Sequence, residues 1–223
     1  MREIVGSMSE WSGVLKDLFR QIDDGSITLR HVQAFLQHRN PFEVNPITDW
    51  QNFYKDTFGL ECNFADLRLP TKQEGFDRLI IVAQGMPPQG IFGKCNELFP
   101  FWKWTGKNLD EIVSSVRTSA NEAYAVWFRN SVEPDEELEN LSANDLEERG
   151  IHGITLEERL LYGLKYFMET EKHLDRENIT LCSGSRYSDG SVPSVNWSHG
   201  KLYVDCYDPN HRYAYLRSRR AVL

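Results

Sequence analysis

The chain has 223 residues, of which 40% are hydrophobic and 26% are charged, so it can bury a core and does not have the composition of a disordered protein. Its formal net charge of −8 excludes a general nucleic-acid-binding protein, because contacts to phosphates need a net basic face. No apolar run approaches the roughly 20 residues that span a bilayer, and the first residues, MREIVGSMSEW, lack the apolar core of a signal peptide. The sequence therefore predicts a soluble, cytoplasmic protein without a membrane partner.

Residues 1–41 are predicted to form an αα-hairpin, because apolar side chains recur at helical spacing on both sides of a short turn. Thr28 can cap the second helix. The turn imitates the middle of a calcium-binding EF-hand loop. Arg20, Ile22 and His31 nevertheless stand where that loop needs oxygen ligands, so we expect no calcium site.

Residues 42–75 show no sustained period and contain several prolines, which predicts a connector with a short helix near Trp50–Phe58 and the main domain boundary. Residues 76–223 are predicted to form an α+β domain. Two short apolar runs, RLIIVA and AYAVWFRN, indicate its two buried strands. Helices are expected between them, including one at Leu109–Ser115.

The strongest helical pattern follows a capping box of Thr155 and Glu158. Its apolar residues share one stripe, which consists of Leu160, Leu161, Leu164, Phe167 and Met168. From residue 179 the period changes to two, which predicts an antiparallel β-meander over residues 179–223. In one of its strands Leu202, Val204 and Cys206 alternate with Tyr203, Asp205 and Tyr207.

The four cysteines are few and widely spaced, which predicts reduced thiols rather than a disulfide framework. The chain has no C-x₂-C or H-E-x-x-H motif, and its six histidines lie far apart in the sequence. We therefore expect no metal site and no cofactor.

Cys182 is the candidate nucleophile, because it precedes the flexible segment Ser183-Gly184-Ser185. A thiolate needs a neighbouring base, and His199 or His211 could supply one, with Asp205 orienting that base. This pattern would make the protein a cysteine-dependent hydrolase or transferase. A buried, unreactive position for Cys182 fits the same spacing, and the sequence leaves both interpretations open.

Five of the nine tyrosines follow residue 185, among short polar residues and arginines. Tyrosine offers a large contact area at low entropic cost, so such a mixture suits a binding surface. Ordinary strand propensity explains the same tyrosines equally well. Because side chains alternate along a strand, we expect an outward-facing set of binding residues. This set consists of Tyr187, Tyr203, Asp205, Tyr207, Arg217 and Arg219.

Several segments carry a resemblance to known sequences: LPTKQEGFDRLIIV, LSANDL, LEERLLYGLKYF, LCSGSRYSDGSVPSVNW, LYVDCYDP and LRSRRAV. They resemble a protein family that recurs in the genomes of candidate-phyla-radiation bacteria, over most of residues 10–223. The resemblance implies a bacterial protein but no activity, because none is assigned to that family. The last forty residues, with V-x-W-x-x-G-K-x-Y-V and L-R-x-R-x-V, are also similar to the closing strands of C-type-lectin-like domains, which implies ligand binding.

Together these patterns predict an α+β protein with an N-terminal αα-hairpin, then two buried strands with helices, and a final antiparallel β-meander. We expect a non-enzymatic binding protein that holds an unknown protein or small ligand on the Tyr/Arg-bearing face of the meander. The alternative is an enzyme centred on Cys182. A third interpretation treats the meander as a core layer without a ligand.

Overall fold

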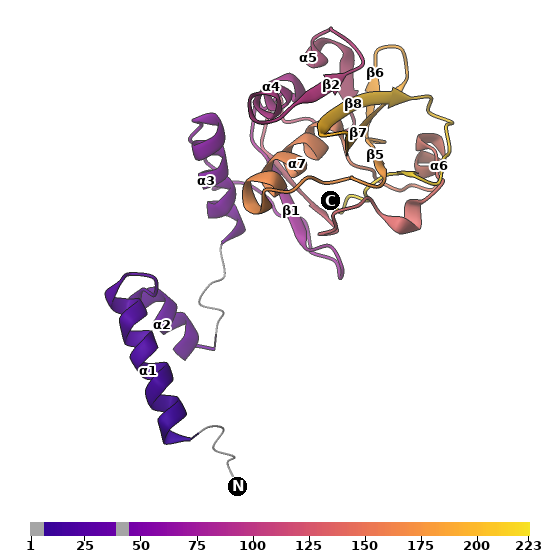
Figure 1. Cartoon of the computed structure of the whole chain (residues 1–223). Coiled ribbons are helices and arrows are strands. Elements are labelled where there is room, and N and C mark those ends of the chain that lie inside the picture. Colours follow the sequence, from indigo (N-terminus) through magenta and orange to yellow (C-terminus); the bar gives the residue numbers. More distant parts are fainter. Residues whose placement is uncertain (1–6, 39–44) are drawn as a thin grey trace. The chain divides into compact units, whose positions relative to one another are not determined.

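The computed structural model describes residues 7–38 and 45–223 of the chain (Figure 1). It divides into two compact units, Met1–Asn45 and Pro46–Leu223. The end of the predicted hairpin, residues 39–41, and the first residues of the predicted connector, 42–44, lie outside the described residues. In the described part of the chain, no helix has both the length and the apolar composition to cross a membrane.

The first unit contains the predicted hairpin of α1 (Met8–Asp23) and α2 (Leu29–Leu36). Both helices begin at a capping box, with Ser7 and Thr28 as the capping residues. Two short helices cannot enclose each other's apolar stripes, so many large apolar side chains of the hairpin remain exposed. The most exposed of them are Val14, Phe19, Leu29, Phe35 and Leu36.

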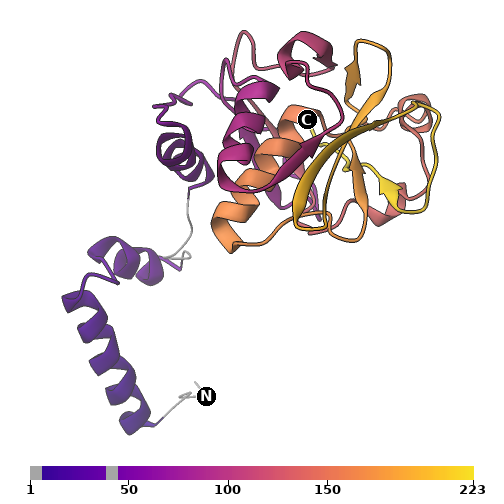
Figure 2. The same cartoon turned by 45° about the horizontal axis from the view of Figure 1, so that its top comes forward.

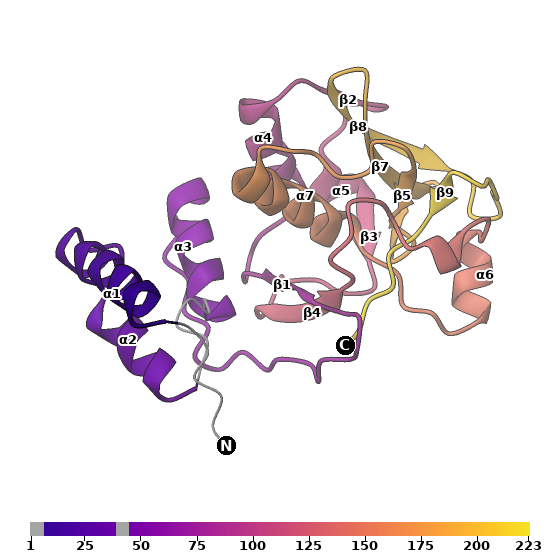
Figure 3. The same ribbon diagram turned by 60° about the horizontal axis from the view of Figure 1, so that its bottom comes forward.

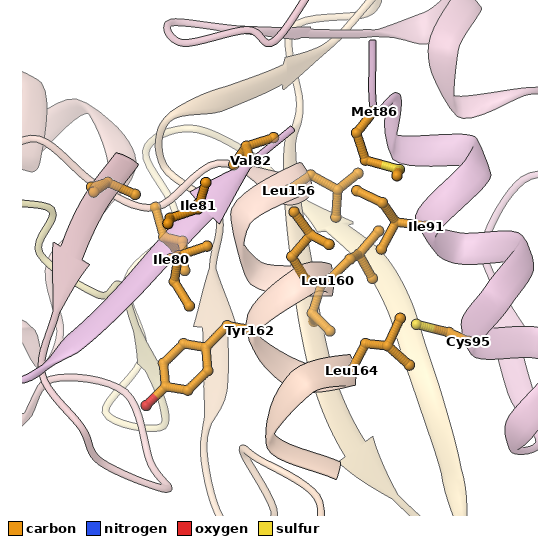
Figure 4. Close-up of a cluster of buried hydrophobic side chains, with 14 of the residues drawn as sticks. Ile80, Ile81, Val82, Met86, Ile91, Cys95, Leu156, Leu160, Tyr162 and Leu164 are labelled. Atoms are coloured by element: carbon orange, nitrogen blue, oxygen red, sulfur yellow. The ribbon is translucent and has the colours of Figure 1, made fainter. Parts of the chain in front are cut away.

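The main core of the second unit surrounds α7 (Leu156–Thr170), which contacts α4 (Pro88–Leu98) on one side and the predicted strand pair on another (Figures 2 and 4). The two predicted strands are β1 (Arg78–Val82) and β4 (Tyr124–Phe128), which pair in antiparallel orientation. Ile81 of β1 is fully buried. The prediction of two buried strands accompanied by helices is confirmed.

Helix α7 is buried on more sides than its sequence pattern predicts. Leu160, Leu161 and Leu164 lie in the core as expected, but Met168 is 50% exposed. The polar face of the first turns is buried as well, including Glu157. Buried polar groups need hydrogen-bond partners, so the segments around α7 must supply them.

Helix α3 (Pro46–Phe58) differs from the predicted connector, because it is part of the core. The indole N–H of Trp50 donates to the carbonyl oxygen of Leu79 (3.1 Å). The hydroxyl of Tyr54 donates to the carbonyl oxygen of Ile81 (2.8 Å). Both acceptors belong to β1. The aromatic residues of α3 therefore attach this helix to the strand, and residues 46–75 belong to the second unit.

The predicted meander forms the centre of a five-stranded sheet (Figure 1). Its three central strands pair in antiparallel orientation, and the edge strands β2 and β9 join in parallel. His199 and Gly200 make the tight turn between β7 and β8. Across the sheet the order is β2 (Phe101–Lys103), β8 (Lys201–Tyr207), β7 (Val192–Ser198), β5 (Ile179–Leu181) and β9 (Leu216–Arg217).

A third, two-stranded sheet pairs β3 (Val113–Ser115), labelled in Figure 3, with β6 (Ser185–Tyr187), labelled in Figure 1. The predicted helix at Leu109–Ser115 therefore stops early, as α5 (Leu109–Ile112). Pairing with a distant strand overrides the local helical pattern here. The remaining elements are the short helix η1 (Glu136–Leu138) and α6 (Ala143–Glu148). The chain is an α+β protein, as its sequence predicts.

Candidate functional site

Alternation along β8 gives the five-stranded sheet a core face and an outer face. In the antiparallel register of β7 and β8, Val195 lies opposite Val204 and Ser194 lies opposite Asp205. The two valines are fully buried in the main core. Tyr203 and Asp205 therefore point to the other side of the sheet, as the sequence predicts.

The part of the outer face next to β2 is open. Because β2 runs parallel to β8, Trp102 lies beside Tyr203, with ring centroids 5.6 Å apart and planes tilted by 39°. Trp102 is 42% exposed, whereas Tyr203 and its β7 neighbour Asn196 are half-buried. Asp205 follows two residues along β8 on the same face. We call Trp102, Asn196, Tyr203 and Asp205 the open face.

The rest of the outer face is covered by α6 and by the loop after β8. The loop is fixed to α6 by a hydrogen bond from the backbone N–H of Asn144 to Pro209 O (3.1 Å) and by the ion pair of Arg212 with Asp145 (2.6 Å). Under this cover lies a second, small core of Ala143, Leu181, Val192 and Leu216.

Four aromatic rings follow one another at the end of β8. The ring centroids of Tyr207 and His211 are 5.1 Å apart, those of His211 and Tyr213 are 4.2 Å apart, and those of Tyr213 and Tyr215 are 5.1 Å apart. Tyr207 packs against the small second core, so Tyr213 and Tyr215 are the tyrosines of this stack that are exposed.

Two of the predicted binding residues are buried, so they lie away from the exposed surface. Tyr187 of β6 is 3% exposed and packs edge-on against Trp104, with ring centroids 5.4 Å apart. The prediction that Arg217 and Arg219 share an outward face is wrong, because Arg219 is fully buried. In the parallel pairing of β9 with β5, Arg217 is the neighbour of the buried Thr180, so its side chain starts on the core side of the sheet. Arg219 is two residues further along and therefore lies on the same side.

Arg219 instead belongs to a buried charge network around Asp175. The Asp175 carboxylate accepts hydrogen bonds from Arg219 and from Arg159 Nε (2.7 Å). Arg219 also donates to the carbonyl oxygens of Ser131 (2.9 Å) and Val132 (2.8 Å). Burial alone would lower the pKa of Arg219, but the facing carboxylate raises it above its usual value. The network therefore fixes the end of the chain to α7 and to the 131–132 segment.

The candidate catalytic residues do not come together. Cys182 is fully buried in the main core, and burial raises the pKa of its thiol well above the usual range. His199 lies in the β7–β8 turn, just before β8 begins at Lys201. Asp205 is four residues further along this strand, which is about 13 Å at roughly 3.3 Å per residue, so the two side chains are far apart. His211 lies in the aromatic stack. A buried thiol that faces away from Asp205 does not form the predicted arrangement of nucleophile, base and orienting group.

The Ser-Gly-Ser segment forms a close crossing with the chain just before α7. A Cβ atom at Gly184 would lie 2.7 Å from the carbonyl oxygen of Gly153 and 3.2 Å from that of Ile154. The hydroxyl of Ser185 accepts a hydrogen bond from the backbone N–H of Leu156 at the start of α7 (2.9 Å). The motif therefore has a structural explanation, since its small residues let two backbone segments meet.

A surface cavity of about 500 Å³ lies beside this crossing, between β3, α6 and residues 183–186. The arginine that lines it, Arg186, donates to the carbonyl oxygens of Ser183 (2.8 Å) and Ser185 (2.9 Å). The same guanidinium lies 3.5 Å from the carboxylate of Glu147. Acceptors of the chain itself therefore hold this arginine, so it is not directed at a ligand.

Two open-face residues are missing from the set predicted from the sequence: Asn196 and, as the exposed aromatic residue of that face, Trp102. Trp102 lies about a hundred residues before Tyr203, in a strand of only three residues. The run Phe101-Trp102-Lys103-Trp104 is a weak signal in the sequence, since large aromatic residues repeat there with a period of two. Only the pairing of β2 with β8 reveals that Trp102 and Tyr203 are neighbours.

Within the described ranges, no three His, Cys, Asp or Glu side chains are grouped so that they could hold a metal ion. In the hairpin turn, Asp24 accepts a hydrogen bond from the backbone N–H of Ser26 (3.0 Å), which is ordinary turn chemistry. Comparisons with protein-family models, with curated proteins and with solved structures find no match for this chain. Function is therefore inferred from the geometry of the chain itself.

Proposed function

We propose that the chain is a non-enzymatic binding protein that receives an extended segment of a protein partner on the open face. The observation that carries this proposal is the pair of Trp102 and Tyr203, held side by side at the edge of the five-stranded sheet. Tryptophan and tyrosine are enriched at the centres of protein interfaces, because they bury a large area with few rotatable bonds.

The place of this pair in the sheet favours an extended ligand. Strand β2 is the last strand on its side of the sheet, and edge strands present backbone donors and acceptors that a further strand can use. A segment added there would lie next to Trp102. Asn196 of β7 and Asp205 of β8 lie further from this edge, so they would contact polar side chains of the partner that extend across the open face.

Site-specific photocrosslinking tests this proposal directly. A photoreactive phenylalanine analogue in place of Tyr203 should give a discrete crosslinked species in cells of the source organism. Trp102→Ala in the same chain should abolish that species, since loss of a central aromatic residue costs about 2 kcal/mol or more of binding energy. It should leave the fold intact, because the ring of Trp102 is 42% exposed.

Met168 provides the matched control position, because it is 50% exposed and lies at the end of α7, outside the open face. The analogue at Met168 should give no discrete species. Equal crosslinking from the two positions would contradict the proposal. So would a crosslink from Tyr203 that survives Trp102→Ala in protein shown to be folded by circular dichroism.

A further inference from the structure

A smaller cavity, of about 230 Å³, lies at the start of α7 and contains a buried carboxyl group. Glu157 lines this cavity and is 3% exposed, and Asp110 of α5 lines it as well. Hydroxyl groups provide further polar atoms, whereas Met86, Pro87 and Val113 give it an apolar wall. No lysine, arginine or histidine is among the described residues that line it, so a cation would meet no like charge there.

The hydrogen bonds of Glu157 indicate that it can carry a proton. The hydroxyl oxygen of Ser119 lies 2.7 Å from Glu157 Oε1 and 3.2 Å from the carbonyl oxygen of Met86. A hydroxyl has one hydrogen to donate, and a carbonyl can only accept. Both contacts are satisfied together when Ser119 donates to Met86 and a neutral Glu157 donates to Ser119. The other oxygen, Oε2, has no hydrogen-bond partner among the described residues.

The surroundings of Glu157 favour the neutral acid when the cavity is empty. The pKa of its carboxyl is raised to about 7, mainly by burial and also by the carboxylates of Glu158 and Asp110, whereas the hydrogen bond with Ser119 and the charge of Arg117 lower it. Besides burial, the negative charge of Glu157 contributes to raising the pKa of two tyrosines, Tyr54 of α3 and Tyr124 of β4. A ligand that brings a positive charge would reverse this balance.

We propose that this cavity binds the primary ammonium group of a small aliphatic amine, with Glu157 and Asp110 as the counter-charges. An ammonium group has three donors, and the cavity offers two carboxyl groups and several hydroxyl oxygens as acceptors. The apolar wall fits a short alkyl chain. A hard divalent metal ion fits less well, because calcium takes six to eight oxygen ligands.

Binding is coupled to one proton. When the ammonium group enters, the carboxyl proton of Glu157 leaves to solvent and the carboxylate remains. Ser119 can then turn its hydroxyl from Met86 to Glu157 Oε1, at the same 2.7 Å contact. Because only the ionised carboxyl pairs with the ligand, the apparent affinity follows the ionised fraction of Glu157. It should rise about tenfold between pH 6 and pH 8 for a carboxyl of pKa near 7.

Calorimetric titration of the full chain with n-butylamine, which is protonated over this pH range, tests the proposal. We expect saturable binding at pH 8, weaker binding at pH 6, and no binding of butyrate or n-butanol. Weaker binding of 1,4-diaminobutane than of n-butylamine is expected, because its second ammonium group would meet the apolar wall while both carboxyl groups pair with the first. Absence of saturable heat with n-butylamine at pH 8, or equal affinity for butyrate, would overturn the proposal.

Glu157→Gln should lower the affinity at pH 8 at least tenfold and remove its pH dependence. The amide can donate to Ser119 as the neutral acid does, so the variant should fold. Glu111→Gln is the matched control, since Glu111 is an exposed carboxyl on the same short helix as Asp110 and does not line the cavity. Unchanged affinity in a folded Glu157→Gln variant, or an equal loss in Glu111→Gln, would refute the assignment.

Discussion

Arg219 and Asp175 form an ion pair that is closed to solvent, although 44 residues separate them in the sequence. Their side chains are 1% and 0% exposed. Arg159 of α7 binds the same carboxylate, and Arg219 also lies over the ring of Tyr162, 5.1 Å from its centroid. The end of the chain is therefore tied to the central helix by charges that water does not reach.

Arg219→Met should lower the free energy of unfolding by about 1–3 kcal/mol, because Asp175 keeps only Arg159 as a partner and buried acceptors on residues 131–132 lose their donor. Urea denaturation followed by circular dichroism measures this loss. Arg217→Met is the control, since Arg217 pairs with the more exposed Glu139. Its loss should be about 1 kcal/mol or less. Equal losses in the two variants would show that the buried network does not stabilise the fold.

Gly184→Ala should lower the free energy of unfolding by about 1–3 kcal/mol, because the added methyl group would overlap the carbonyl oxygen of Gly153. Gly93→Ala in α4 makes the same chemical change where no atom lies within 4 Å. It should raise stability by about 0.5–1 kcal/mol through helix propensity. A Gly184→Ala variant as stable as the unaltered chain would remove the structural explanation of the Ser-Gly-Ser motif.

Cys182 should react with iodoacetamide far more slowly than Cys62 at neutral pH. Burial raises the pKa of both thiols, but Cys182 is fully buried and Cys62 is partly exposed. Mass spectrometry after timed labelling identifies the modified residues. Labelling in urea should remove the difference. Rapid modification of Cys182 in the folded protein would restore the cysteine-dependent enzyme as a candidate.

Glu157 should destabilise the folded chain progressively as the pH rises from about 4.5 to about 7. In this range the unfolded carboxyl loses its proton while the folded one, with a pKa of about 7, retains it. The folded state then binds more protons, so stability falls as pH increases. Relative to Glu157→Gln, the free energy of unfolding of the unaltered chain should fall by about 2–3 kcal/mol between these limits and level off about one pH unit above the folded pKa. Thermal unfolding of both proteins across this range measures the difference.

The capping boxes and the periodicity were sufficient to predict several elements. The capping box of Thr155 and Glu158 marks the start of α7. The period of two in residues 201–207 places Tyr203 and Asp205 on one face of β8 and Val204 on the other. The failures have a common cause. Residues 113–115 form a strand because β6 pairs with them, and Trp50 belongs to the core because β1 accepts its hydrogen bond. In both cases a partner far along the chain decided the outcome.

The sequence by itself determined the α+β class, the two helices of the hairpin, the two buried strands and the alternation along β8, because each depends on neighbours within about ten residues. Only the tertiary structure decided which polar and aromatic residues are buried, which form a surface and which line a cavity. Arg219 and Tyr187 are enclosed, Trp102 joins Tyr203 at an edge, and Glu157 lines a cavity. Burial and charge pairing depend on segments that are distant in sequence, and a single sequence does not show which of them meet.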